Sequence, residues 1–321
     1  MTIDILLRFT RRAMACEFEV VVQGGDRRYL ADVAQAALDE VERLDEQLSA
    51  FRPRSEVSHI NAEACLRAVA VEPGLFRLLR TAAEVSADTN GAFDVTAAPL
   101  VELWREAERT GKEPSGKAIG AAAANVGMSH VLFDDRSNRV RFDSPGVRID
   151  LGAIGKGYAV GRAAEVLREY GVEAALVSGG GSSIYALGAP QGTEGWSIGI
   201  RHPSRLESRV HTVVLKDCAM STSGGVRQRD PDVDERFEHI VDPVAPAPIA
   251  AEPTAASVTV FAGDPAVADA LSTAFYLRGA SLAETYCRSH PGVYALFVER
   301  ETQDADFVVR RVGSRLDYGG I

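Results

Sequence analysis

The segment Asp150–Tyr158 constrains the fold of this chain more than any other. Residues 146–150 alternate between apolar and polar side chains as in a strand, and apolar residues with helical spacing follow until Gly171 ends the pattern. Between them, glycines allow the backbone to approach a ligand closely. The sequence therefore predicts a strand, a glycine-rich turn and a helix whose first N–H groups, with Lys156 beside them, favour a phosphate group.

This segment fits neither of the two common phosphate-binding loops. A Walker loop needs Ser or Thr after its Gly-Lys pair, whereas Gly157 follows Lys156 here. A Rossmann turn needs Gly-x-Gly-x-x-Gly at the turn itself. A plain glycine-rich turn with a surface lysine therefore stays open as the alternative.

Composition narrows the class of protein. The chain has 321 residues, of which 46% are hydrophobic, enough for the core of one large domain or two. Its net charge of −10 argues against nucleic acid as a partner, because such binding needs a basic face. No apolar run approaches a membrane span, and the N-terminus lacks the core of a signal peptide. The four cysteines have no paired spacing, so we expect free thiols and a cytoplasmic protein.

The apolar pattern predicts helices that are grouped apart from the strands. Turns or loops are expected at 55–61, 111–117, 220–225 and 226–237, and Thr96 as a helix cap. Helices are expected at 27–51, 73–90, 96–109 and 265–277, and strands at 14–22, 130–134, 139–143, 174–178, 183–187, 196–200, 209–216 and 257–262. We therefore predict an α+β fold with mainly antiparallel sheets in two interleaved lobes, residues 1–321 forming a single catalytic unit.

Two groups of residues suggest chemistry. Asp269 and Thr273 are four apart on the helix expected after Pro265, so they share one face. With a backbone carbonyl they form a set of hard oxygen donors that suits Mg²⁺. The alternative is that Thr273 bonds its own helix and Asp269 is solvated. His239 in a cleft can take a proton from a hydroxyl, although a lone histidine is more often structural.

Eight short stretches, in this order, resemble the FAD:protein FMN transferases of the ApbE family. One such stretch alone is a weak signal, whereas eight in the family's order are specific and span most of the chain. They are Met14-Ala-Cys16, Ser49–Pro53, Ser55–Asn61, Gly91–Thr96, Asp150–Tyr158, Ser221–Gly224, His239–Pro243 and Ala268–Thr273.

The resemblance implies an enzyme that splits FAD with Mg²⁺, moves FMN to a Thr or Ser hydroxyl of an acceptor flavoprotein domain and releases AMP. It implies that His239 is the base that activates this hydroxyl. The residues implied to contact FAD are Met14, Phe51, Ala92, Phe93, Asp94, Asp150, Lys156 and Ile240. The implied metal ligands are the Ala153 carbonyl, Asp269 and Thr273. The flavin itself comes only from the resemblance.

The chain also departs from the family pattern. Residues 14–16 read Met-Ala-Cys instead of Met-Gly-Thr, 180–182 read Gly-Gly-Ser instead of Gly-Gly-Asp, 225–226 read Gly-Val instead of Asp-Tyr, and the Thr-Gly expected after Asp242-Pro243 is missing. The implied metal ligands and Lys156 are kept, so the departures bear on acceptor docking or transfer rate. Two other functions stay open: an FAD pyrophosphatase that gives FMN to water, and a non-catalytic flavin-binding or storage protein.

Overall fold

The computed structural model describes residues 5–203, 205–224, 240–245, 247–248, 255–300 and 306–314. Its main sheet has eight strands, and every neighbouring pair is antiparallel. In spatial order they are β1 (Ile5–Ala13), β2 (Cys16–Gly24), β6 (Ala175–Gly179), β7 (Ser183–Leu187), β10 (Cys218–Gly224), β13 (Ala255–Ala262), β14 (Tyr294–Arg300) and β15 (Phe307–Val312). The predicted α+β class is confirmed.

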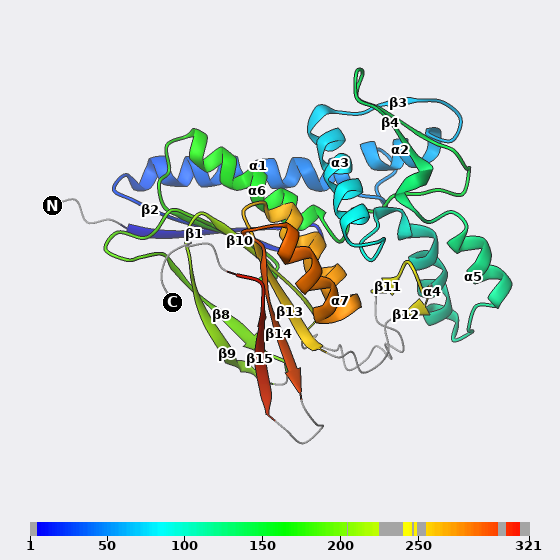
Figure 1. Cartoon of the computed structure of the whole chain (residues 1–321). Helices are drawn as coiled ribbons and strands as arrows, with labels where there is room; N and C mark the ends of the chain where they lie inside the picture. The colour runs from blue at the N-terminus through cyan, green and yellow to red at the C-terminus, as the bar shows by residue number, and fades with distance from the viewer. Residues whose placement is uncertain are drawn as a thin grey trace.

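Layers on both faces bury the main sheet (Figure 1). Helices α1 (Arg27–Leu48), α6 (Gly155–Glu169) and α7 (Pro265–Ser289) cover one face and supply much of the larger apolar core. The hairpin of β8 (Trp196–His202) and β9 (Arg205–Leu215) covers the other face, where its inward side chains pack against those of β13 and β14. The sheet therefore has a helical side and a hairpin side.

A second group of elements lies beside the helical layer in Figure 1. The chain enters this group after α1 and leaves it at α6, so the group is an insertion between two parts of the main sheet. Its members are α2 (Glu56–Glu63), α3 (Pro73–Asp88), η1 (Val95–Ala97), α4 (Ala98–Thr110), α5 (Gly116–Ala123), η2 (Met128–His130), the sheet of β3 (Val69–Ala70), β5 (Arg139–Phe142) and β4 (Val131–Asp134), and the later pair β11 (Val241–Asp242) and β12 (Ala247–Pro248). The single catalytic unit stays a prediction.

None of the helices in the described part of the chain has both the length and the apolar composition needed to cross a membrane. All four cysteines are free, as predicted; Cys218 and Cys287 are buried, and Cys16 and Cys65 are partly buried.

The turn expected at 55–61 is wrong, because this segment forms α2. The Ser55 hydroxyl accepts a hydrogen bond from the Ser58 N–H at 2.9 Å and caps the helix, whose Val57 and Ile60 are buried. The preceding helix ends at Leu48 rather than at residue 51, because the N–H groups of Phe51 and Arg52 donate to the Ser49 hydroxyl and not to helix carbonyls.

The strand expected at 146–150 is also wrong. The backbone there is satisfied without a neighbouring strand: Ile149 donates to Asn61 Oδ1 at 2.8 Å and accepts from Asn61 Nδ2 at 2.9 Å. The Asp150 N–H donates to the Val95 carbonyl at 2.8 Å. A side chain and a loop thus replace the partner strand that the alternating pattern predicted.

Three further expectations need correction. Residues 220–224, expected as a turn, continue β10, and α5 begins at Gly116 inside the loop expected at 111–117. Thr96 caps no helix; Asp94 caps η1 instead, accepting the Thr96 N–H at 2.8 Å. The loop expected at 226–237 lies outside the described residues.

Helices α6 and α7 approach closely at Gly157. A Cβ built on Gly157 would lie 2.1 Å from the Pro265 carbonyl oxygen and 2.7 Å from the Asp269 Cβ. Only glycine fits at this crossing, which brings the start of α6 against the first turns of α7.

We therefore expect Gly157→Ala to lower the free energy of unfolding by about 1–3 kcal/mol, because the added methyl group overpacks this contact. Urea unfolding followed by circular dichroism measures the change. Gly120→Ala in α5 is the matched control: its Cβ meets nothing within 4 Å, so helix propensity alone should stabilise it by up to about 1 kcal/mol. A Gly157→Ala protein as stable as the parent would show that the two helices are not packed this closely at Gly157.

Candidate active site

The buried carboxylate of Asp269 is the centre of the candidate site. Its helix α7 begins at Pro265 and is capped by Asp264, whose Oδ1 accepts the Ala266 N–H at 2.7 Å. Asp269 is 5% exposed. Its Oδ2 accepts the Gly157 N–H at 2.9 Å, and its Oδ1 accepts the hydroxyls of Ser183 at 3.0 Å and Ser221 at 2.8 Å. One carboxylate therefore ties α7 to α6, β7 and β10.

Every described partner of Asp269 is neutral. A buried charge is costly unless an opposite charge or several hydrogen bonds compensate it, and here only hydrogen bonds do so. More oxygen atoms lie close by: Ser223 Oγ is 2.8 Å from Ser272 Oγ and 3.3 Å from Thr273 Oγ1. A carboxylate with a free charge among hydroxyl oxygens is a donor set that can hold a hard cation such as Mg²⁺.

Ala153 lies in the turn before α6, and Lys156 is the second residue of this helix. The N–H groups of Gly155 and Gly157 donate to the Leu151 carbonyl and to Asp269, so these two are already engaged and the anion site expected at the helix start is reduced. The side chain of Lys156 has no acidic partner among the described residues. Burial raises the pKa of the nearby Cys16 thiol, and the positive charge of Lys156 opposes this rise. Lys156 is therefore the positive charge that the site offers.

Asp94 and Asp150 lie together beside this turn, joined by the hydrogen bond of Asp150 N–H to Val95. Asp94 accepts from the N–H and hydroxyl of Thr96 at 2.8 and 2.6 Å and from the Met128 N–H at 3.1 Å. Burial raises the pKa of Asp94, although these hydrogen bonds work against the rise. Asp150 directly precedes the glycine-rich turn, where its Oδ1 accepts the Gly152 N–H at 2.8 Å.

The other residues implied to contact FAD differ in exposure. Ala92 and Phe93 are 1% and 2% exposed, and their N–H groups donate to the Thr89 carbonyl at 3.1 Å and to the Thr89 hydroxyl at 3.3 Å. Phe51 is 68% exposed, with the Arg105 guanidinium 5.5 Å above its ring. Met14 and Ile240 are partly buried against the larger core. His239 lies outside the described residues.

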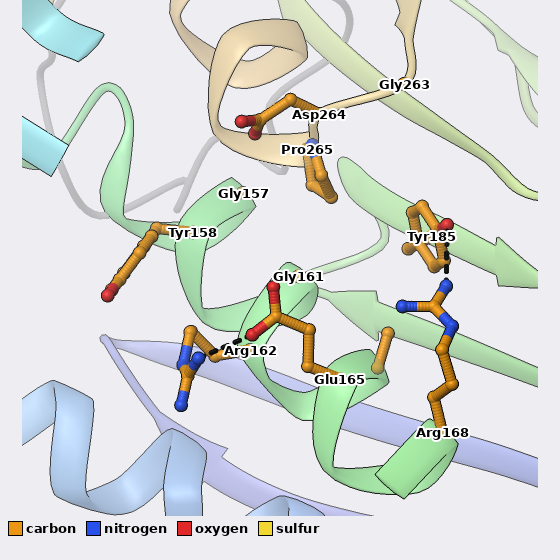
Figure 2. A pocket seen from close by; sticks show the side chains of 11 residues that line it. Gly157, Tyr158, Gly161, Arg162, Glu165, Arg168, Tyr185, Gly263, Asp264 and Pro265 are labelled. Atoms are coloured by element: carbon orange, nitrogen blue, oxygen red, sulfur yellow. Dashed lines mark hydrogen bonds and ion pairs between the residues drawn. The ribbon is translucent and has the colours of Figure 1, made fainter. Parts of the chain in front are cut away.

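A cleft of about 280 Å³ runs along α6 next to Gly157 (Figure 2). Its arginines already have partners: Arg162 pairs with Glu165, and Arg168 donates to the Tyr185 hydroxyl at 3.1 Å. Lys156 does not line it. Because Glu165 and Asp264 also line the cleft, its two arginines give it no net positive charge for a pyrophosphate group.

The family model described as ApbE family matches residues 14–297. The chain belongs to the ApbE family. The FAD:protein FMN transferase of Treponema pallidum is 32% identical over 291 residues, 85% of this chain and 79% of that protein. The FAD:protein FMN transferase of Escherichia coli K12 is 28% identical over 286 residues, 86% of this chain and 80% of that protein.

Solved ApbE structures share the whole architecture. The apo flavinyl transferase ApbE of Pseudomonas stutzeri superposes with a TM-score of 0.81 at 31% identity, covering 96% of this chain and 95% of that one. The ApbE protein of Thermotoga maritima gives a TM-score of 0.80 at 29% identity, covering 96% of this chain and 97% of that one. The resemblance found in the sequence is thus confirmed over nearly the full length.

Sequence reasoning missed two parts of this ApbE site. Ser183 and Ser221 hold the Asp269 carboxylate, yet they lie on β7 and β10, whose small polar residues resemble turn residues when read alone. The signal available was the spacing of Ser221 and Ser223, which puts both hydroxyls on one face of a strand. The sequence around Asp45 indicates only that this residue lies near the end of α1.

We expect Asp269→Ala to lower the free energy of unfolding by about 1–3 kcal/mol, because it leaves the buried N–H of Gly157 without an acceptor. Asp269→Asn should cost much less: its amide oxygen still accepts from Gly157, and the two serine hydroxyls can rotate to accept from its NH₂ group. Chemical unfolding of the two variants beside the parent protein measures the difference. Equal losses in both would mean that charge, not hydrogen bonding, holds these elements together.

Proposed function

We propose that this ApbE protein is an FAD:protein FMN transferase, which moves FMN from FAD to a hydroxyl of an acceptor protein and releases AMP. The observation that carries the proposal is the buried, charge-unpaired Asp269 among hydroxyl oxygens, next to the glycine turn with Lys156. Relatives named FAD:protein FMN transferase support it.

The reaction balances as a phosphoryl transfer. The oxygen of a Thr or Ser hydroxyl on the acceptor attacks the phosphorus of the FMN half of FAD. A P–O bond forms to this oxygen while the bridging P–O bond breaks, and AMP leaves with the bridging oxygen. The hydroxyl proton passes to a base, for which we propose His239, following the family resemblance.

We further propose that Asp269, Thr273 and the Ala153 carbonyl hold Mg²⁺. The oxygen donors around Asp269 fit this hard cation, and its bound charge would stabilise the negative charge that shifts onto the leaving phosphate. Lys156 then binds the pyrophosphate from the first turn of α6 and orients it. The Ser223 hydroxyl helps to hold Thr273 through its hydrogen bond to Thr273 Oγ1, and Ser223 is in turn bonded to Ser272.

Following the family resemblance, we assign the flavin and adenosine contacts to Met14, Phe51, Asp150, Ile240 and the segment of Ala92, Phe93 and Asp94. We also propose a cytoplasmic location; the four free cysteines fit a reducing compartment. The acidic net charge supports a protein acceptor over nucleic acid.

The main alternative is an FAD pyrophosphatase, in which water replaces the acceptor hydroxyl. The purified protein with FAD and Mg²⁺ distinguishes the two when AMP is measured with and without a threonine-bearing acceptor domain. A transferase releases AMP faster with the acceptor and adds the mass of FMN to it. A pyrophosphatase releases AMP at one rate and leaves the acceptor unmodified, and a storage protein binds FAD without releasing AMP.

We expect Asp269→Asn to slow AMP release from FAD at least about 10²-fold, because the charge that meets the metal is lost while the fold is kept. Liquid chromatography of AMP at saturating Mg²⁺ measures the rate. Asp264→Asn is the matched control on the same helix: asparagine caps helices as well as aspartate does, so its rate should equal that of the parent. AMP release by Asp269→Asn at the parental rate would make Asp269 purely structural.

We expect His239→Ala to abolish mass-detected flavinylation while slow release of FMN and AMP persists. A positioned base speeds deprotonation by about 10² to 10⁴, and water can reach the phosphorus without it. His211→Ala, an exposed histidine on β9, serves as control and should transfer FMN normally.

Undiminished transfer by His239→Ala would assign the base elsewhere. Asp242 is the next candidate, although its Oδ1 already accepts from Arg278 at 2.7 Å and from the Val244 N–H at 2.9 Å. An ordinary carboxylate is also a weaker base than an imidazole.

A further inference from the structure

The turn between β1 and β2 has a backbone that its residues do not favour. The strands pair up to Ala13 and Cys16, so Met14 and Ala15 form a two-residue turn. Their φ angles are 48° and 59°. Two-residue hairpin turns of this kind favour Gly, Asn or Asp, since a Cβ is strained at positive φ. Something outside the turn must hold it in this conformation.

Asp45 on α1 supplies that support. Its Oδ1 accepts the Met14 N–H at 3.0 Å, a bond between residues far apart in the sequence. Its other oxygen, Oδ2, accepts from the Arg52 guanidinium. The Asp45 side chain is only 17% exposed, which strengthens both charge-assisted bonds. One carboxylate therefore joins the β1–β2 turn to the segment that follows α1.

Both segments border the candidate site. Cys16 follows the turn directly, and its thiol lies within the field of Lys156, Asp45 and Asp269. On the other side, the N–H groups of Phe51 and Arg52 donate to Ser49 Oγ at 3.2 and 3.1 Å, which orders the backbone of both residues. The carboxylate of Asp45 thus links the backbone of Met14 to the segment that carries Phe51, two residues assigned to FAD.

We propose that Asp45 is a positioning residue for FAD: it holds the Met14–Ala15 turn and the Phe51–Arg52 segment in the arrangement that receives the dinucleotide. The inference rests on the proposed function, which names FAD as the ligand. Asp45 touches no reacting atom, so its effect is on binding rather than on the chemical step. Ala15 depends on Asp45 in particular, because glycine at this position would adopt a positive φ unaided.

The test uses Asp45→Ala, Ala15→Gly and the double variant. We expect Asp45→Ala to raise the Kd for FAD about tenfold, as calorimetry with the whole protein measures it, a change equivalent to about 1.4 kcal/mol. The rate of AMP release at saturating FAD should stay within about twofold of the parent, since a uniform binding contact raises KM and not kcat. Ala15→Gly alone should leave the Kd unchanged, and in the double variant it should restore most of the lost affinity.

Asp39→Ala is the matched control. Asp39 lies on the same helix and also pairs with an arginine, Arg11, but it is far more exposed and makes no bond to the turn. Its Kd for FAD should equal that of the parent.

A second readout needs no FAD. The rate at which a thiol reagent labels Cys16, mapped by mass spectrometry against Cys65, should rise in Asp45→Ala and fall again in the double variant, because the freed turn exposes the adjacent thiol.

Parental FAD affinity in a destabilised Asp45→Ala protein would overturn the proposal and leave Asp45 a structural residue. The proposal also fails if Ala15→Gly in the double variant neither recovers FAD affinity nor lowers the rate of Cys16 labelling. Asp45 would then not affect FAD binding through the turn. If the parent protein itself does not bind FAD, the proposed function fails instead, and Cys16 labelling still decides whether Asp45 holds the turn.

Discussion

The buried negative charge of Asp269 is the constraint on which the rest of this structure depends. Its described partners are one backbone N–H and two hydroxyls, so compensation comes from the geometry of α6, β7 and β10 and not from an arginine or lysine. Each of these elements must place a donor within hydrogen-bonding reach of the same two oxygens. This requirement explains why Gly157 lies at the helix crossing and why serines occupy buried positions on two central strands.

Periodicity could predict the frame around this charge but not the contacts that complete it. The strands and the long helices follow from apolar spacing, which is a property of each segment alone. The extended segment at 146–150 shows the same alternation, yet its partner is the side chain of Asn61, 88 residues away in sequence. Likewise, the sequence around Ser221 is typical of a turn, and only the structure shows that its hydroxyl donates to Asp269. The spacing of apolar residues indicates which face of a segment is buried, but it does not indicate which polar group that segment contacts.

The departures from the family pattern acquire physical meaning at the β1–β2 turn. Alanine stands where the family has glycine, at a φ of 59°, and the structure retains the turn because Asp45 bonds the preceding N–H. Cysteine at position 16 keeps a small side chain beside Gly180, whose added Cβ would lie 3.3 Å from Sγ. Both departures thus lie at one turn, whose backbone is bonded to Asp45. The substitutions at 225–226 lie outside the described residues.

The charges around the site also make the proposed metal and FAD depend on each other. A pyrophosphate brings negative charge to a region that already holds the carboxylates of Asp269, Asp94 and Asp150, against Lys156 as the positive side chain identified there. Like charges in a partly buried site repel strongly, because little water screens them. The proposed divalent cation at Asp269 would offset this net negative charge, so we expect FAD to bind well only with the cation, and by linkage the cation to bind more tightly with FAD. Such mutual dependence would allow an acidic site to bind a polyanionic substrate that it would otherwise repel.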